Sequence, residues 1–310
     1  MWKQRHLKAK PTKYWEDAVL MYLERTALKE NTRKKLTSLL KWVDQYLRRR
    51  SLLSITKQVI EEMAIAKEQT GCGPITVNIM LRKVKTILRR ACYDWEWIDK
   101  VPTIRLRKEP ASRVRWEAPE TLAQVIALCP AHKRDAILLS LSTGLRKGHV
   151  AAMQKSWIDK EHGVITIPAH LYKNGKPHTS PLNELAMQII ERNWNNHEIY
   201  LFVYQGKPMK ELNTKAWRDA LKKAGITDFR WHDMRHTWAS WMAQNGEQLL
   251  TIMESGGWSD YRSVKRYAHL AIDNLKQAAD RLAGTKLSRL EKDSVTFLAR
   301  LEKKGENENG

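Results

Sequence analysis

The sequence predicts a mainly α-helical chain with a small antiparallel sheet, an α+β fold divided into two domains. Through the first third, apolar residues recur three and four positions apart, which is the spacing of amphipathic helices. Between residues 99 and 115 this periodicity stops, and Pro102 and Pro110 interrupt the chain. Further on, Asn174-Gly175 favours a tight hairpin turn because both positions tolerate positive φ. With 310 residues, 42% of them hydrophobic, the chain is long enough to build a core in each domain.

The first domain is expected over residues 14–100, as a bundle of helices behind a basic N-terminal arm of residues 1–13. Turn residues such as Gly71, Gly73 and Pro74 separate the last two helices. The helices are predicted at residues 14–26, 31–50, 55–69 and 75–97. The fourth helix carries an apolar stripe opposite a basic face, which consists of Arg82, Lys83, Lys85, Arg89 and Arg90.

A basic linker is expected to follow at residues 101–115. The chain has 55 Lys and Arg against 34 Asp and Glu, a net charge of +21, and +15 of this excess lies in residues 1–115. A charge run of this kind is often only a solvated surface, but its concentration in one region favours a polyanionic partner, with nucleic acid first. The candidate DNA contacts are the basic face of the fourth helix and three linker residues, Arg105, Arg107 and Lys108.

The second domain is expected over residues 116–285 and mixes helices with a hairpin, and a C-terminal helix and polar tail follow at 286–310. Strands are predicted at residues 163–168 and 177–181, on either side of the Asn-Gly turn. Helices are predicted at residues 118–128, 133–153, 182–194, 214–224, 231–244, 249–254, 272–283 and 287–301.

Other classes of protein are disfavoured by what the sequence lacks. Its three cysteines, Cys72, Cys92 and Cys129, are widely spaced and have no zinc-type partners, so neither disulfides nor a structural metal is expected. No apolar run has the length of a signal peptide or a membrane span. A reducing cytoplasm is therefore the expected location.

Three segments carry residues suited to phosphate chemistry. Ser142-Thr143-Gly144-Leu145-Arg146 places an arginine directly after a break in an apolar run. In the predicted helix 231–244, His232, Arg235 and His236 share a face, so one fixed cation and two titratable donors can reach one phosphodiester oxygen. The third segment places Tyr267 nine positions after Gly256-Gly257-Trp258. Each segment alone is weak evidence, because such residues usually serve packing or surface hydrogen bonds.

Together, the order of these segments resembles the catalytic signature of the tyrosine recombinases and phage integrases. The match runs through Thr-Gly-Leu-Arg, a hairpin lysine, His-Asp-x-Arg-His-Thr, Gly-Gly-Trp and Arg-Tyr-Ala-His-Leu, and it covers residues 112–285. The resemblance implies a catalytic domain there and a helical DNA-clamping, core-binding domain before it. It implies DNA cleavage and rejoining through a 3′-phosphotyrosine, with neither ATP nor a metal.

The resemblance also assigns roles to individual residues. Arg146 and Arg235 would bind the scissile phosphate, and Trp258 would donate its indole N–H to it. Tyr267 would be the nucleophile. His232 would accept or share its proton, while Asp233 and His236 would support the site. Lys173 would protonate the leaving 5′ oxygen, with Lys176 as the alternative for that role. Three residues after the first arginine the family usually has an acid, whereas this chain has His149, which cannot supply a fixed negative charge.

The partner implied is double-stranded DNA at specific attachment-type sites, bound by a homo-tetramer on two sites. In the family a C-terminal segment docks on the neighbouring protomer; here it could equally pack on its own chain. Accessory directionality or DNA-bending proteins are also implied, and integration or excision of a phage or genomic island is the expected role. Two alternatives stay open: a DNA-binding protein of this fold with lost catalysis, and a type IB topoisomerase. A generic basic RNA-binding protein would explain the charge and none of the motifs.

Overall fold

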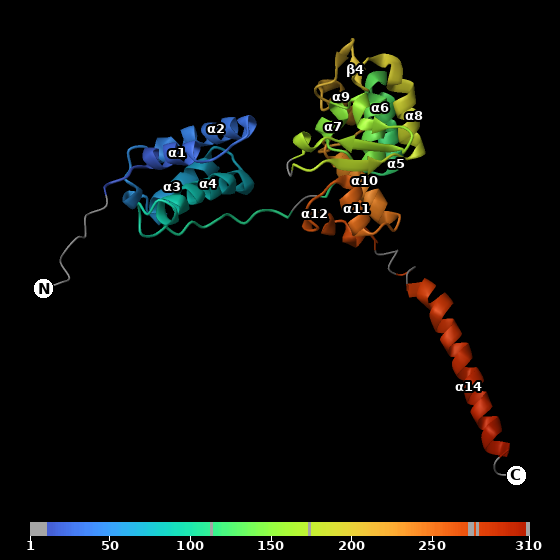
Figure 1. Cartoon of the computed structure of the whole chain (residues 1–310). Helices are drawn as coiled ribbons and strands as arrows, with labels where there is room; N and C mark the ends of the chain where they lie inside the picture. The colour runs from blue at the N-terminus through green and yellow to red at the C-terminus, as the bar shows by residue number, and fades with distance from the viewer. Residues whose placement is uncertain (1–10, 112–113, 173–174, 272–275, 277–278, 308–310) are drawn as a thin grey trace. The chain divides into compact units, whose positions relative to one another are not determined.

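The computed structural model describes residues 11–111, 114–172, 175–271, 276 and 279–307, without the side chains of 271, 285, 287 and 298–307. The chain divides into two compact units, Met1–Ser112 and Arg113–Gly310, each with its own hydrophobic core. Figure 1 shows the two units in different colours, blue to teal for the first and green to red for the second. The predicted α+β fold class is confirmed.

The first unit is a bundle of four helices. Apolar side chains from all four fill one core, among them the fully buried Trp15, Val43, Met63 and Val84. Helix ends follow ordinary capping rules: Thr56 accepts a hydrogen bond from the third residue of the following helix, and Pro74 opens the last one. The elements are α1 (Trp15–Glu24), α2 (Glu30–Leu47), the 3-10 turn η1 (Leu52–Ser54), α3 (Lys57–Gln69) and α4 (Pro74–Tyr93).

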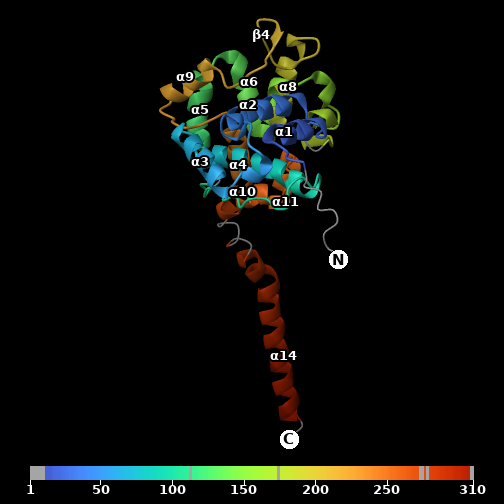
Figure 2. The same cartoon turned by 90° about the vertical axis from the view of Figure 1, so that its left-hand side faces the viewer.

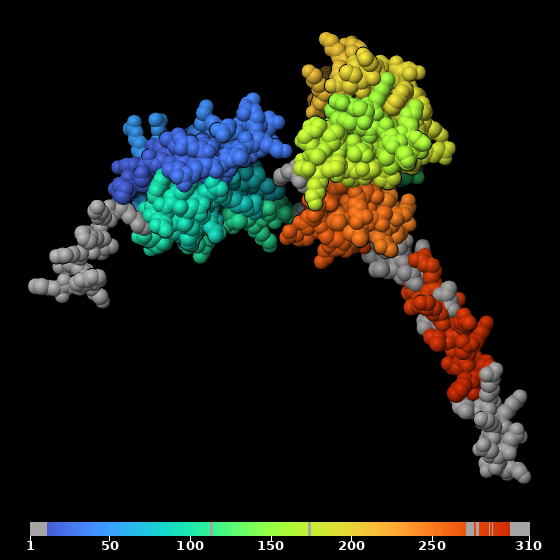
Figure 3. All heavy atoms as spheres, in the orientation of Figure 1, coloured from blue at the N-terminus to red at the C-terminus, as the bar shows by residue number. Residues whose placement is uncertain are grey.

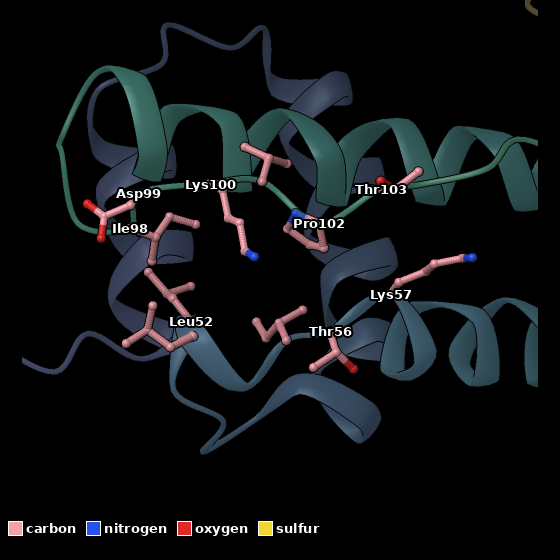
Figure 4. Close-up of a pocket in the computed structure, with 11 residues that line it drawn as sticks. Leu52, Thr56, Lys57, Ile98, Asp99, Lys100, Pro102 and Thr103 are labelled. Atoms are coloured by element: carbon pink, nitrogen blue, oxygen red, sulfur yellow. The ribbon is translucent and has the colours of Figure 1, made fainter.

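The predicted linker differs from what the structure shows, because most of it packs on the first unit. Ile104 is buried in the core of this unit. The amide of Asn78, itself only 1% exposed, accepts from the backbone N–H of Arg107 and donates to its carbonyl, at 2.7 and 2.9 Å. In Figure 4, Ile98 to Thr103 lie across from the segment at Leu52 and Lys57, with a cavity of about 470 Å³ between them. The sequence could not show this, since the few apolar residues of this basic stretch have neither helical nor strand periodicity.

Arg107 was predicted to contact DNA, and its side chain is instead engaged inside the first unit. The guanidinium donates to both carboxylate oxygens of Glu61, at 2.8 and 3.1 Å, and to Glu68 at 2.5 Å. Its side chain is 18% exposed. Two carboxylates already use its donors, so this arginine stabilises the packing of the 104–109 segment on α3.

The other predicted DNA contacts of this unit fall into two groups. Arg82 pairs with Glu109 at 2.7 Å, Lys83 donates to the hydroxyl of Tyr22, and Arg90 donates to Thr26. The remaining four are exposed: Lys85, Arg89, Arg105 and Lys108.

The second unit is built around α6, which is buried on most of its surface. Helices α8 and α10 pack against it, and Figures 1 and 2 show α5 and α9 with them in the same body of the unit. The helices are α5 (Pro119–Leu128), α6 (Ala131–Thr143), α7 (Lys147–Ala151), α8 (Glu184–Asn193), α9 (Lys215–Lys223), α10 (Asp233–Gln244), α11 (Leu249–Gly256), α12 (Arg262–Lys265) and α14 (Ser288–Asn307). Shorter turns are η2 (Lys155–Trp157), η3 (Ala169–Leu171), η4 (Trp194–Asn196), η5 (Ala268–Ala271) and the π-helix η6 (Ala283–Leu287).

A three-stranded antiparallel sheet, in the order β1-β2-β3, confirms the small sheet that the sequence predicts. Its strands are β1 (Ile158–Asp159), β2 (Val164–Ile167) and β3 (His178–Pro181), with Ile167 opposite His178. The turn η3 lies between β2 and β3, so their connection is longer than the predicted tight hairpin. A second hairpin, β4 (Val203–Tyr204) with β5 (Lys207–Pro208), was not predicted because strands of two residues leave no pattern.

Helix α14 has exposed apolar side chains at Leu290, Val295 and Phe297. The predicted helix at 272–283 falls largely on residues outside those described. None of the helices in the described part of the chain is both long and apolar enough to cross a membrane.

The predicted helix at residues 133–153 is in fact two helices, and Gly144 separates them. This residue ends α6 in the left-handed conformation, with φ of 62°. A Cβ atom at this position would lie 2.3 Å from the Trp238 ring, so the backbone passes too close to α10 for any side chain. The turn directs Arg146 away from the axis of α6, and Arg146 then begins α7.

Gly144→Ala should destabilise the second unit strongly. The left-handed backbone costs an L-residue about 1 kcal/mol, and the overlap with Trp238 raises the expected loss to about 3 kcal/mol. Gly163→Ala is the matched control, because Gly163 also has φ of 62° but nothing lies within 4 Å of its added Cβ. Urea unfolding, followed by amide exchange in α6 and α10, measures the free energy of unfolding of both variants. Equal losses in the two variants would show that the close approach to Trp238 does not matter.

Arg107→Ala should loosen the first unit, by about 1–2 kcal/mol after allowance for the partly exposed glutamates. The change removes three hydrogen bonds to two carboxylates. The backbone N–H of Arg107 can still donate to Asn78, so the loss should be local. Amide exchange in α3 and α4 of the full chain measures it. The exposed Arg105→Ala is the control and should change the free energy by less than about 0.5 kcal/mol.

Candidate active site

The turn after α6 and the first turn of α10 bring Arg146 and Arg235 to the same buried place. Arg235 is 3% exposed, and its Nη1 donates to the carbonyl of Gly144 at 2.6 Å. Arg146 donates from Nη2 to the carbonyl of Gly257 at 3.2 Å. The two predicted phosphate-binding arginines are thus held by backbone carbonyls of two turns.

Each guanidinium keeps a buried nitrogen with no hydrogen-bond acceptor among the described residues, Nη1 of Arg146 and Nη2 of Arg235. Burial, and then the neighbouring charge of Arg146, lower the pKa of Arg235 to about 9. No carboxylate in the described part of the chain is paired with either group. Unpaired buried cations cost several kcal/mol, and an anion bound between them would offset this cost. The arrangement therefore suits an anion.

Trp258 covers Arg235 from one side. The Cζ atom of Arg235 lies 3.5 Å from the centre of the indole ring, close enough for a strong cation–π interaction. Trp258 in turn stacks on Trp238, with an angle of 22° between the rings. A Cβ atom on Gly256 would lie 2.1 Å from Trp258, which explains the first glycine of Gly-Gly-Trp. The face of the Trp258 ring therefore contacts Arg235. This contact adds to the role that the resemblance implies for Trp258, which is donation of its indole N–H to the phosphate.

Tyr172, which the sequence analysis did not single out, lies beneath Arg146. The guanidinium carbon is 4.8 Å from the centre of this ring, and His149 packs on the same ring at 4.8 Å. Burial, and then the charge of Arg146, lower the pKa of His149 to about 4, so this imidazole is neutral at physiological pH. An aromatic ring thus lies beside Arg146, near the position from which the family's acid would act. Only its place next to the hairpin lysine could have drawn attention to Tyr172.

His178 is a second residue that the sequence analysis missed. It lies at the start of β3, and its Nε2 is 3.1 Å from the carbonyl of Ser255. Its ring is close to Tyr172 and would touch any Cβ atom added to Gly257. Burial lowers its pKa, so it adds no positive charge beside the arginines at neutral pH. A histidine in a polar, short strand gives no sequence signal of this role.

Tyr267 follows α12 and is fully buried. Its hydroxyl lies 2.5 Å from Nδ1 of His236, and the centres of the Tyr267 and Trp258 rings are 6.3 Å apart. Burial raises the pKa of Tyr267 to about 12, so the hydroxyl is protonated at neutral pH. His236, predicted as a supporting residue, is therefore in direct contact with the predicted nucleophile.

His232 and Asp233 lie at the beginning of α10. His232 contacts His236 edge to face, with 5.2 Å between ring centres, and burial followed by the charge of Arg235 lowers its pKa. Asp233 is buried, and its Oδ2 accepts from the backbone N–H of Arg230 at 2.8 Å. Asp233 thus fixes the start of the helix that carries Arg235 and His236. Lys173 lies outside the described residues, and Lys176 is exposed.

The side chains of this site suit the binding and cleavage of a phosphodiester. Two guanidinium groups can hold the non-bridging oxygens of a phosphodiester, and a tyrosine hydroxyl with an imidazole partner can act as an oxygen nucleophile. Among the described residues no cluster of His, Cys, Asp and Glu could hold a metal ion. In Figure 3 the segment that carries α10 to α12 forms one continuous part of the second unit.

Comparison with known proteins agrees with this arrangement. A model of the phage integrase family matches residues 116–273, about half of the chain, and these residues hold every described member of the site. The integrase of Salmonella phage P22 is 35% identical over 218 residues, which are 65% of this chain and 56% of the relative. This chain therefore spans little more than half the length of that relative.

Solved structures show the same fold. The Tn1549 transposon integrase in complex with transposon right end DNA matches with a TM-score of 0.74 and 21% identity, over 86% of this chain and 98% of that one. A lambda integrase tetramer bound to a Holliday junction matches with a TM-score of 0.69 and 17% identity, over 83% and 78%. On the evidence of the family model and of the site that it covers, the chain belongs to the phage integrase family.

Proposed function

We propose that this protein is a site-specific DNA recombinase that cleaves and rejoins DNA through a covalent bond to Tyr267. One observation carries the proposal: the guanidinium groups of the buried Arg235 and the partly buried Arg146 each have a buried nitrogen that lacks an acceptor among the described residues, and they lie in the same site as a buried tyrosine hydroxyl. A phosphodiester would supply the acceptors that these nitrogens lack, and the tyrosine would supply the attacking oxygen.

In the proposed reaction, Arg146 and Arg235 bind the non-bridging oxygens of the scissile phosphate and stabilise the charge that builds up in the transition state. The Tyr267 oxygen attacks phosphorus as its proton leaves, and the bond to the 5′ oxygen breaks. The hairpin lysine, Lys173, is proposed to protonate this leaving oxygen. The 5′ hydroxyl of a partner strand then reverses the attack, so the bond energy is conserved without a cofactor.

Two aromatic residues are proposed to hold the arginines for this reaction. Trp258 lies on Arg235, and its indole N–H is the proposed further donor to the phosphate. Tyr172 lies beneath Arg146, next to the neutral His149. Neither ring brings a negative charge that would compete with the phosphate, and the pKa of Arg235, about 9, keeps its guanidinium cationic at neutral pH.

The proposed partner is double-stranded DNA, bound by a homo-tetramer across two sites in the bacterial cytoplasm. The lambda integrase tetramer on a Holliday junction, which has the same fold, supports this assembly, and the P22 integrase supports a role in integration or excision. In the first unit, the proposed phosphate contacts are four exposed members of the basic set: Lys85, Arg89, Arg105 and Lys108. Accessory directionality or DNA-bending proteins belong to the same proposal, as does docking of the C-terminal segment on a neighbouring protomer.

Tyr267→Phe should bind site DNA with nearly unchanged affinity and form no covalent protein–DNA adduct, because only the attacking oxygen is lost. Adducts are measured on a nicked attachment site by denaturing gel. Tyr261→Phe, an exposed tyrosine of the same segment, is the matched control and should retain adduct formation.

Three further results would distinguish the alternative functions. If the wild-type chain binds DNA and forms no adduct, it is a DNA-binding protein of this fold without catalysis. Relaxation of plasmids that carry no attachment site would instead support topoisomerase-like activity. An adduct that persists in Tyr267→Phe would sink the assignment of the nucleophile.

The neutral His149 leads to a pH dependence of stability. Its pKa in the folded chain, about 4, lies below the ordinary value of 6.5, so the unfolded chain binds the proton first. The free energy of unfolding should therefore be highest above pH 6.5 and fall as the pH drops toward 4, by up to roughly 3 kcal/mol from this residue. His149→Asn should reduce this slope in urea unfolding at pH 7, 6 and 5, whereas the exposed His170→Asn should leave it unchanged.

A further inference from the structure

The hydroxyl of Tyr267 can attack phosphorus only if some group takes its proton, and the resemblance gives that role to His232. We propose that His236 takes the proton instead, and that His232 acts through His236 as a positioning residue. The inference rests on the proposed function and names a further catalytic residue for the same reaction.

The contacts of the hydroxyl carry the inference. Nδ1 of His236 is 2.5 Å from the Tyr267 oxygen, which is hydrogen-bond distance. The ring of His232 contacts the ring of His236, 5.2 Å away and nearly perpendicular to it. Because the Tyr267 side chain is fully buried, bulk water does not reach the hydroxyl. The adjacent imidazole nitrogen is thus the acceptor in place before DNA binds.

The charges near His236 explain why proton transfer from Tyr267 is expected only after DNA has bound. The charged groups that act on the neighbouring His232 are Arg235 and Asp233 on α10, Arg146 before α7 and Arg266 next to Tyr267. Three of these groups, Arg266, Arg235 and Asp233, also act on Tyr267, the hydrogen-bond partner of His236. Three cations against one acid oppose a further positive charge on an imidazole. A bound phosphodiester adds negative charge between the arginines and removes part of this opposition. Proton transfer to His236 is thereby coupled to occupation of the phosphate site.

Before attack, neutral His236 carries its proton on Nε2 and accepts the hydroxyl hydrogen bond at Nδ1. During attack the O–H bond of Tyr267 breaks, the proton moves to Nδ1, and the oxygen forms the bond to phosphorus while the 5′ oxygen leaves. The leaving oxygen takes a proton from the general acid. In the joining direction His236 returns its proton to Tyr267.

Adduct formation on a nicked site tests the step. His236→Ala should form the phosphotyrosyl adduct roughly 100-fold more slowly than the wild-type chain, the usual size of a general-base contribution. Added imidazole should restore part of the rate, because it can occupy the vacated space and accept the proton. His236→Gln keeps a hydrogen-bond acceptor that is not a base, and it should be as slow as the alanine variant.

A second assay separates proton transfer from a merely structural role. In the Tyr267→Phe chain, a 3′-nitrophenyl phosphodiester can be joined directly by a 5′ hydroxyl, which needs the two arginines and no tyrosine proton. Adding His236→Ala to that background should leave this joining rate unchanged within about 3-fold, whereas adding Arg235→Ala should abolish it. An equal loss from both changes would overturn the inference, since His236 would then be supporting the phosphate site.

His232→Ala provides the remaining comparison. It should slow adduct formation less than His236→Ala, and imidazole should not rescue it. If His232→Ala is the slower variant and imidazole rescues it alone, the resemblance-based role is right and the inference fails. In each of these cases the wild-type chain still forms the adduct, so the outcome is distinct from a failure of the proposed function itself.

Discussion

Two like charges, one buried and one partly buried, lie together in the second unit, and the rest of its site is built around them. Arg146 and Arg235 repel each other, and burial raises the cost of keeping both charged. The fold tolerates this because each group donates to a backbone carbonyl that cannot move, one in the turn after α6 and one in the turn after α11. The rings of Tyr172 and Trp258 add attraction without adding a competing anion. A carboxylate in their place would stabilise the empty protein and oppose binding of a phosphate.

Much of this arrangement could be predicted from the sequence, for an identifiable reason. Several helices of both units have a clear 3.6-residue pattern of apolar side chains, among them α2, α4, α8 and α9. The motifs of the predicted site lie where α6 ends and where α10 begins. Arg146, Arg235 and Tyr267 were predicted because several motifs, each weak alone, occur together in the order of the family signature. The break at Gly144 within the predicted helix 133–153 was missed, because only the distance to Trp238 shows why a glycine is required there.

Contacts between distant segments account for the other differences. Arg107 was predicted to contact DNA because it lies in a run of cations. In the structure its guanidinium donates to Glu61 and Glu68 instead, because the chain passes back over α3. Tyr172 and His178 come from either side of the sheet connection, where short strands leave no pattern. His236 shares a helix face with His232, so spacing alone could not tell which ring meets Tyr267; the path of the chain after α12 decides it.

The stack of Trp238 and Trp258 has a consequence for how this site can change by mutation. Gly144 and Gly256 each lie where a methyl group would strike one of the two indoles, so the glycines and the indoles fit one another as a set of four. A smaller ring at position 258 would open a gap under Arg235 unless a neighbour grew to fill it. Residues at these four positions should therefore be inherited together, and a lineage that exchanges tryptophan for histidine at 258 must pass through a poorly packed intermediate or change two positions at once.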